Sequence, residues 1–519
     1  MTTKMLQSAN PMAHLDQMPT LGDIARYYAR ARPAAVAMTF EGRETTFAEF
    51  DHHSNQVAHA LAAEGVKKGE RVAYVGKNSD HYFEIAFGAA KAGVVLIPIG
   101  WRLSPTEISV ILNDCGSSIV FVGPEVMAQV EQALIGVKPR PKVIAMEPIS
   151  SLHCTLYEPW RDAASSSDVT IAVEESDVAL QLYTSGTTGK PKGVMLTNAN
   201  LLSGRQAAAK AQMPWNIWGA DDVSLVAMPV AHVGGSVWGI IGLYNGAKAV
   251  IAREFNPLNV LDYIERDQVS QIFMVPAALQ IVVRQPKARE IDYRRLKYIQ
   301  YGASPIALDL LRECMEVFGC GFCQLYGMTE TSGTIVYLPP EDHSPVGNSR
   351  MRGAGLPMPG VELKIVDWLG ITLPPNAVGE VVTRSMANMA GYWRMQEATN
   401  AIIDPEGWLR TGDAGYLDED GYLYIHDRLK DMIISGAENI YPTEVENAIY
   451  GHPHVAEVAV IGVPDDKWGQ AVKAIIAPRP GVTPDPDDII AFARARIAAF
   501  KVPKSIDFVD ALPRNASGK

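Results

Sequence analysis

Short apolar runs alternate with amphipathic stretches of helical length along most of this chain, up to about Lys430. Apolar runs at 71–76, 94–99, 118–123, 271–275 and 298–301 predict buried strands, and the stretches 82–92 and 105–113 predict helices. Parallel strands need helix-length connections, whereas antiparallel strands can be joined by tight turns. The alternation therefore predicts an α/β fold, with mostly parallel sheets covered by helices.

The pattern changes after residue 361. Short alternating segments at 361–366 and 379–383 lie between Gly, Pro and Asp turns, which indicates a small β-barrel-like unit. Beyond 427–431 the pattern predicts a helix at 442–450, strands at 455–463 and 472–477, and a helix at 486–500. We expect a large N-terminal domain over 1–429 and a small mobile α+β lid over 430–519.

Composition excludes several classes of protein. With 46 Lys+Arg against 58 Asp+Glu, the net charge of −12 argues against a sequence-independent nucleic-acid binder. No apolar stretch reaches the roughly 18 residues that span a bilayer, and the N-terminus lacks a signal-peptide core, so we expect a cytoplasmic protein. The five cysteines have no further partners at zinc-ligand spacing, which favours reduced, buried thiols.

The most informative segment is 183–194, Tyr-Thr-Ser-Gly-Thr-Thr-Gly-Lys-Pro-Lys-Gly-Val. Glycines let backbone N–H groups turn toward an anion, and hydroxyls and lysines add donors and charge. It is not a Walker A loop, because two residues rather than four separate Gly186 from Gly189, and Pro191 follows Lys190. A phosphate-binding loop of another kind is indicated.

This segment resembles the phosphate-binding signature of the adenylate-forming superfamily, which includes acyl-CoA synthetases, coumarate-CoA ligases, firefly luciferase and peptide-synthetase adenylation domains. Further segments match the family's motifs in order, at 325–330, 411–413, 416–422, 427–431, 435–442 and 513–519. The resemblance covers nearly the whole chain. It implies an AMP-forming acyl-CoA ligase, in which ATP and a carboxylic acid give acyl-AMP and pyrophosphate and the CoA thiolate then displaces AMP.

The resemblance assigns most of the ATP site. It places the β- and γ-phosphates against Thr184, Ser185, Gly186, Thr187, Thr188, Gly189 and Lys192. The adenine would stack on Tyr326 and lie beside Gly302, Ala303, Ser304 and Gly327, while the ribose would be bound by Asp413 and Arg428. Thr329 would donate to the α-phosphate, and Glu330 would bind the Mg²⁺ cofactor, which suits a metal that takes few carboxylates plus phosphates.

The lid carries the other assigned residues. Lys519 is similar to the lysine that bridges the carboxylate and the α-phosphate, where it neutralises charge in the transition state. Lys430 matches the family's hinge, and Ser435 and Gly436 match the channel for the pantetheine arm of CoA.

The acyl pocket is assigned by analogy to His232, Val233, Trp238, Ala277, Leu325 and Thr331. Leu325 stands where several relatives carry glycine, so it should close part of the tunnel, and Trp238 adds bulk. We therefore expect an apolar short-to-medium-chain or aryl monocarboxylic acid. No arginine stands out as the partner of a second substrate carboxylate, which disfavours a dicarboxylate.

Several alternatives stay open. The acid could be a long-chain fatty acid, or the acyl group could be loaded onto a carrier protein instead of CoA. A different class, a non-catalytic nucleotide sensor, is disfavoured by the presence of Glu330, Asp413 and Lys519. The natural acid and the oligomeric state, including a homodimer, are not determined by the sequence.

Overall fold

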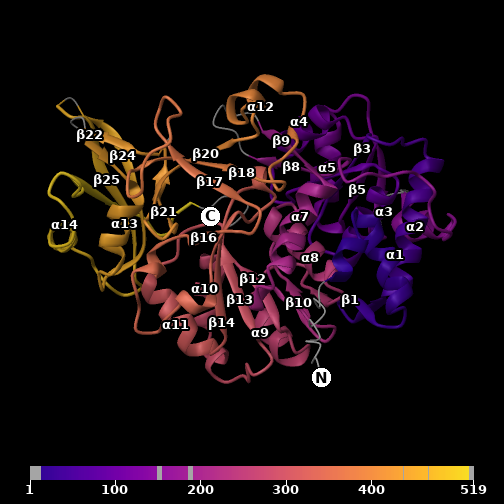
Figure 1. Ribbon diagram of the computed structural model, residues 1–519, viewed down its shortest axis with the longest axis horizontal. Coiled ribbons are helices and arrows are strands. Elements are labelled where there is room, and N and C mark those ends of the chain that lie inside the picture. The colour runs from indigo at the N-terminus through magenta and orange to yellow at the C-terminus, as the bar shows by residue number, and fades with distance from the viewer. Residues whose placement is uncertain are drawn as a thin grey trace, which may run out of the picture.

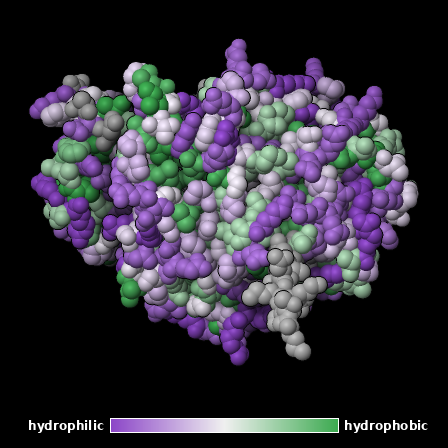
Figure 2. Space-filling model, viewed as in Figure 1, coloured by the Kyte–Doolittle hydropathy of each residue, from purple (hydrophilic) through white to green (hydrophobic). Residues whose placement is uncertain are grey.

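The computed structural model describes residues 13–148, 155–184, 191–429, 431–435, 438–465 and 467–513. Two large sheets with their helices form most of the molecule, and a smaller lid lies at one end (Figure 1). The face in Figure 2 is mostly hydrophilic, with hydrophobic residues gathered toward the end that carries the lid. No helix in the described ranges is long and apolar enough to cross a membrane.

The first large sheet, which we call the β1 sheet, has a parallel centre. Its strands in spatial order are β16 (Leu356–Pro357), β15 (Val336–Leu338), β14 (Gly321–Tyr326), β13 (Tyr298–Gly302), β12 (Gln271–Met274), β10 (Val223–Val226), β11 (Lys248–Ile251), β1 (Val36–Phe40) and β2 (Arg43–Thr46). Strands from β14 to β1 pair in parallel, and β15, β16 and β2 pair antiparallel at the edges.

The second large sheet, the β3 sheet, follows the same plan. Its order is β19 (Gly391–Tyr392), β9 (Lys192–Thr197), β8 (Val178–Thr184), β4 (Val95–Ile99), β3 (Arg71–Val75), β5 (Ile119–Val122), β6 (Lys142–Ala145) and β7 (Thr155–Leu156). The strands from β8 to β7 are parallel, whereas β9 and β19 pair antiparallel. Every residue of β3, β4 and β5 is buried, as expected of parallel strands covered on both faces.

Helices cover both sheets. They are α1 (Leu21–Ala31), α2 (Phe47–Ala63), α3 (Asp80–Lys91), α4 (Pro105–Cys115), α5 (Met127–Leu134), α6 (Tyr157–Asp162), α7 (Asn198–Lys210), α8 (Val233–Tyr244), α9 (Pro257–Arg266), α10 (Pro276–Val283), α11 (Leu308–Phe318) and α12 (Gln396–Ile402). Helix α3 contacts β1 of one sheet and β4 and β8 of the other, so it lies between them. All of its residues are buried, because neither face meets solvent.

Helix starts follow from local sequence. Thr46 caps α2 and Ser104 caps α4, in each case with a glutamate in the third helical position that accepts from the cap backbone. This reciprocal arrangement satisfies two of the N–H groups that a helix end leaves without partners.

A third, antiparallel sheet of β17 (Glu362–Val366), β18 (Gly379–Arg384), β20 (Leu409–Leu417) and β21 (Leu423–Arg428) connects the large sheets to the lid. The lid contains α13 (Pro442–Tyr450), α14 (Pro486–Arg494) and a sheet of β22 (Ile433–Ser435), β23 (Glu438–Ile440), β24 (Val455–Asp465), β25 (Gly469–Pro478) and β26 (Ser505–Phe508). It has its own apolar core, separate from those of the large sheets.

The predicted fold class is confirmed, with mostly parallel sheets, a small antiparallel unit and an α+β lid. The helix predicted at 486–500 is wrong in length, because α14 ends at Arg494. After that residue the chain turns, and Ile497 packs onto the lid core. Cys115, Cys314, Cys320 and Cys323 are free thiols, as expected, and Cys154 lies outside the described residues.

Candidate active site

A cavity of about 1520 Å³ opens where parallel strands of both large sheets end. Residues just after β10, β12, β13 and β14 line it, and so do residues at the ends of β4 and β8. Ligands of open α/β sheets bind beyond the carboxyl ends of the strands, where the connecting loops diverge. The cavity therefore occupies the position that this topology makes available for a substrate.

Three of the predicted nucleotide residues meet at one edge of the cavity. The Tyr326 hydroxyl donates to Asp413 Oδ2 at 2.6 Å, and Arg428 Nε pairs with Asp413 Oδ1 at 2.6 Å. Burial, and then the Asp413 carboxylate, raise the pKa of Tyr326 well above its ordinary value, so the phenol stays a donor. Arg428 itself lines the cavity. The carboxylate that the family resemblance assigns to the ribose is thus held in place by a phenol and a guanidinium.

Glycines allow close backbone contacts at this edge, both between β13 and β14 and within the turn that follows β14. A Cβ on Gly302 would lie 2.0 Å from Leu325 O, and one on Gly327 would lie 1.6 Å from Gly333 O. Ala303, between these loops, has a φ of 68°, a backbone conformation that side chains disfavour. The adjoining Ser304 is half-buried. The backbone is therefore fixed closely around the predicted adenine position.

The predicted metal residue is well positioned. Thr329 and Glu330 begin a short 3₁₀ turn, Thr329–Thr331, and both line the cavity. Glu330 is 6% exposed and accepts from the Tyr392 hydroxyl at 2.9 Å. Burial and the carboxylate raise the pKa of Tyr392. Among the described residues Glu330 forms no ion pair, so its buried negative charge is available to a cation.

The phosphate loop connects two paired strands. Thr184 ends β8 and pairs in register with Lys192, the first residue of β9. Lys192 Nζ lies 4.9 Å from the centre of the Tyr392 ring, which brings this lysine toward Glu330. Ser185, Gly186, Thr187, Thr188 and Gly189 lie outside the described residues, as do Lys430, Gly436 and Lys519. The half-buried Ser435 ends β22 in the lid.

The predicted acid pocket forms the remainder of the cavity. His232, Val233, Trp238, Leu325 and Thr331 all line it. His232 occupies the N-cap position of α8, and the Trp238 indole donates to Leu225 O at 2.9 Å. The Thr331 hydroxyl bonds within its own loop, donating to Met328 O at 3.1 Å. Ala277 is not among the lining residues, because the chain enters α10 at Pro276, and Phe273 and Val275 line the cavity instead.

Sequence reasoning missed several polar residues of this cavity. Arg205, Asn216 and Gln300 line it and are almost completely buried. They come from α7, a short 3₁₀ turn at Pro214–Asn216, and β13. The sequence singles out no arginine for a second substrate carboxylate, and the structure places Arg205 at the cavity. Tyr392, on β19, was missed as well.

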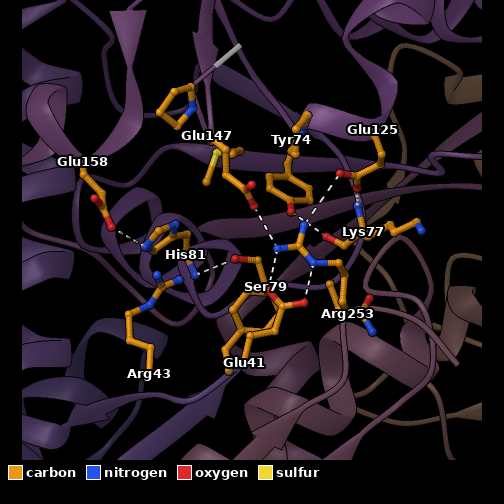
Figure 3. A pocket seen from close by; sticks show the side chains of 16 residues that line it. Glu41, Arg43, Tyr74, Lys77, Ser79, His81, Glu125, Glu147, Glu158 and Arg253 are labelled. Atoms are coloured by element: carbon orange, nitrogen blue, oxygen red, sulfur yellow. Dashed lines mark hydrogen bonds and ion pairs between the residues drawn. The ribbon is translucent and has the colours of Figure 1, made fainter. Parts of the chain in front are cut away.

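A second, smaller cavity of about 320 Å³ lies between the two sheets, beyond the ends of β1, β3, β5, β6 and β11. Figure 3 shows Arg253 at its centre, where it pairs with Glu41 at 2.7 Å and with Glu147 at 2.8 Å. The other basic residues that line it, Arg43, Lys77 and His81, have carboxylate partners too. The basic side chains of this cavity are thus neutralised by ion pairs, which connect the two sheets.

Comparison with known proteins agrees with the geometry. The family model for the AMP-binding enzyme matches residues 26–393, and the model for the AMP-binding enzyme C-terminal domain matches residues 444–519. A fatty acid–[acyl-carrier-protein] ligase from Streptomyces coeruleorubidus is 40% identical over 98% of this chain and 96% of its own. A feruloyl-CoA synthase from an Amycolatopsis species is 36% identical over 95% of each chain.

Solved structures give the same result. The o-succinylbenzoate-CoA synthetase of Bacillus subtilis, in complex with its acyl-adenylate intermediate, superposes with a TM-score of 0.83 at 31% identity, with 96% of each chain covered.

The fold and the site define an ATP-dependent adenylate-forming enzyme. The chain belongs to the AMP-binding enzyme family, which confirms the resemblance to the adenylate-forming acyl-CoA ligases. It is an enzyme of the acid–thiol ligase class.

Proposed function

We propose that this enzyme joins a carboxylic acid to ATP to form acyl-AMP and pyrophosphate, and then transfers the acyl group to the thiol of CoA. The observation that carries the proposal is the joining of two regions in one cavity. Gly327, Thr329 and Arg428 of the nucleotide edge line the same cavity as the largely apolar pocket at Val233, Trp238 and Leu325.

The chemistry needs positive charge at the point where the regions meet. A carboxylate must attack an α-phosphate, so two anions approach each other, and preorganised donors and cations lower that barrier. Thr329 lines the cavity, and the family resemblance assigns its hydroxyl as a donor to the α-phosphate. Arg428 holds Asp413 in place for the ribose. The binding of nucleotide and acid in one cavity converts a bimolecular encounter into a positioned reaction.

The residues present fit a magnesium ion. Glu330 is a buried carboxylate without an ion-pair partner in the described part of the chain, and a buried charge is costly unless it is paired. Mg²⁺ is usually held by one or two carboxylates plus substrate phosphates. Bound there, it would neutralise phosphate charge, while Tyr392 keeps the Glu330 carboxylate oriented.

Residues of the lid complete the proposal. By family resemblance, Lys519 serves adenylation, Lys430 is the hinge between large domain and lid, and Ser435 and Gly436 border the path of the CoA thiol. We place the domain boundary at 429/430 on the same ground. A cytoplasmic location and a homodimer remain predictions.

A second acceptor is favoured by a specific comparison. The Streptomyces relative, 40% identical over 98% of this chain, is named as a ligase that acts on an acyl-carrier protein. A carrier protein presents a thiol on a pantetheine arm, so the chemistry of the second step is the same. The natural acceptor of this enzyme is therefore either CoA or a carrier protein.

The test is a measurement of AMP and pyrophosphate release over a panel of acids. Each acid is supplied with ATP and Mg²⁺ alone, with CoA, or with a phosphopantetheinylated carrier protein. The proposal expects acid-dependent pyrophosphate release, and multiple turnovers only when an acceptor thiol is present. Asp413→Ala removes the carboxylate assigned to the ribose, and this variant should lose ATP-dependent turnover. Binding of ATP without pyrophosphate release from any acid would favour the nucleotide sensor instead.

A further inference from the structure

Arg205 of α7 is a buried cation that lines the acid end of the active-site cavity. Its side chain is 5% exposed, and its Nε donates to Asn245 Oδ1 at 3.1 Å, as does its Nη2. Its Nη1 has no hydrogen-bond partner in the described part of the chain. No carboxylate among the described residues forms an ion pair with it. A guanidinium is therefore buried with one amide oxygen as its hydrogen-bond acceptor.

The surroundings of Arg205 add donors and aromatic rings. The guanidinium lies 5.6 Å from the centre of the Trp218 ring, and the Trp218 indole N–H is itself buried without a hydrogen-bond partner among the described residues. Because burial disfavours a positive charge that has no counter-charge, the pKa of Arg205 is lowered to about 9. A buried cation without a counter-charge is costly, and an acceptor in the cavity that Arg205 lines would relieve that cost.

Arg205 lies at the end of the cavity that is remote from the nucleotide. His232 caps the start of α8, and Asn245, which holds Arg205, follows its last turn. At about 1.5 Å per residue this separation is roughly 20 Å along the helix. Val237, Trp238 and Ile241 of α8 line the cavity between these points. A molecule whose carboxylate meets the nucleotide therefore extends along α8 toward Arg205.

Two buried amides line the same cavity. Asn216 is 7% exposed and Gln300 is 4% exposed, and the side chain of neither makes a hydrogen bond with other described residues. A pocket for a plain hydrocarbon would not need these groups, because buried polar side chains normally have partners. Their presence makes the acid pocket partly polar.

A purely structural role explains only part of this arrangement. Arg205 meets the C-terminal end of α8, where a cation is favourable, and Asn245 also donates back to Ile241 O at 2.7 Å. That role accounts for Nε and Nη2. It does not account for the unpartnered Nη1 or for the placement of a charge against the substrate cavity.

We propose that the acid substrate carries an oxygen acceptor at the end remote from its reacting carboxylate, and that Arg205 binds this oxygen. The acceptor is a hydroxyl, a carbonyl or a second carboxylate, which share hydrogen-bond acceptance as their chemistry. Arg205 is then a residue that determines specificity. The inference rests on the proposed function, since it concerns the acid which that function activates.

The experiment compares acids of equal chain length that differ only at the remote end. Plain alkanoates, ω-hydroxy acids, ω-oxo acids and dicarboxylates are each supplied with ATP and Mg²⁺, and the second-order rate constant for the single turnover of pyrophosphate release is measured without an acceptor thiol. We expect at least one oxygenated acid to exceed its matched alkanoate by about 10-fold or more, because a site built around buried donors rejects an analogue that leaves them unpaired. Preference for the dicarboxylate would indicate charge pairing, and preference for the hydroxy or oxo acid a neutral acceptor.

Arg205→Met should reduce that preference ratio to near unity. Lys210→Met is the matched control, because Lys210 also lies on α7 and loses a cation, but its side chain is 65% exposed. If Arg205→Met does not fold, as judged by its melting temperature, Asn216→Leu serves instead, since it removes a buried amide that lines the same cavity and keeps the size of the side chain. It should lower the same ratio.

The possible failures are distinguishable. Pyrophosphate release that favours alkanoates, or a preference that Arg205→Met leaves unchanged, would overturn this inference and leave the proposed function intact. Absence of pyrophosphate release with every acid would overturn the proposed function, and this inference with it.

Discussion

At the residue scale, the nucleotide edge depends on glycines that no other residue can replace without movement. A Cβ on Gly327 would lie 1.6 Å from Gly333 O, so Gly327→Ala forces the loop before Thr329 to shift. Misplacement of catalytic groups by about 1 Å can cost on the order of 100-fold in rate. We expect Gly327→Ala to slow pyrophosphate release by about that factor.

Gly204 provides the control for this variant. It lines the same cavity, yet a Cβ there meets nothing within 4 Å. Gly204→Ala should therefore keep its activity, and it should gain a little helix stability, since alanine favours a helix by about 1 kcal/mol over glycine. Equal rates in the two alanine variants would show that the loop tolerates the shift.

Glu330 gives a prediction about metal. Glu330→Gln keeps the size and can still accept from Tyr392, but it removes the buried negative charge. The Mg²⁺ concentration needed for half-maximal adenylation should rise by roughly 10-fold or more, as for other losses around metal sites. A titration of Mg²⁺ at saturating ATP measures it. Tyr392→Phe, which removes only the orienting hydroxyl, should have a smaller effect, and an unchanged Mg²⁺ dependence in Glu330→Gln would remove this residue from the metal site.

Site residues can be predicted from the sequence where they lie next to one another in a contiguous motif. One strand ends at Tyr326, and Gly327, Thr329 and Glu330 follow it directly, so these residues can be placed together from the sequence alone. Arg205, Asn216 and Gln300 come from three separate elements with no characteristic spacing. Only the packing of α7 against α8 and the β1 sheet brings such residues to one cavity, so the sequence alone offered no signal for them.

At the element scale, Glu446 on α13 makes the lid sensitive to pH. Its carboxylate accepts from Val460 N at 2.8 Å, but burial raises its pKa from 4.5 to about 7. The folded lid therefore binds this proton more tightly than the unfolded chain does. Its contribution to stability is greatest below pH 4.5 and falls as the pH rises toward about 7.

Glu446→Gln should remove this dependence, because the amide can accept from Val460 without a charge. We expect the variant to be more stable than the parent at about pH 8, by on the order of 1–3 kcal/mol, and nearly equal to it below about pH 5. Melting temperatures across that range measure the difference. Glu438→Gln, an exposed carboxylate of the same lid, should change neither value, and a parallel pH profile for parent and Glu446→Gln would contradict the prediction.

The sequence predicts helices and strands well where the spacing of apolar residues matches the side chains that the fold buries. The strands near 71–76 and 94–99 and the helix at 442–450 are predicted to within a residue or two, because uniform apolar runs, and amphipathic stretches that begin at a proline, have few alternatives. The end of α14 is not, since Ile497 docks onto the lid core through tertiary packing. Local sequence carries no information about that contact.

At the scale of the whole molecule, the orientation of the lid is held by contacts that cross the predicted hinge. Asp427 lies on β21 before Lys430, and its Oδ2 accepts from the backbone N–H and the hydroxyl of Thr443 at 2.9 and 3.0 Å. The Tyr450 hydroxyl and the Gln280 amide bond at 3.1 Å between α13 and α10. Rotation at residue 430 would separate both pairs, so these bonds belong to one lid orientation.

Thr443→Val tests this two-state description because it keeps the shape of the side chain and removes only the hydroxyl donor. A hydrogen bond to a charged group contributes about 1.5–3 kcal/mol, so its loss should shift the balance of orientations by roughly 10-fold. The two half-reactions, adenylation and thiol transfer from supplied acyl-AMP, should then change in opposite directions when each is measured separately. Tyr450→Phe should shift the balance the same way, since it weakens the same orientation at a second contact. If both variants slow the two half-reactions by the same factor, these contacts stabilise the fold in general and do not select between lid orientations.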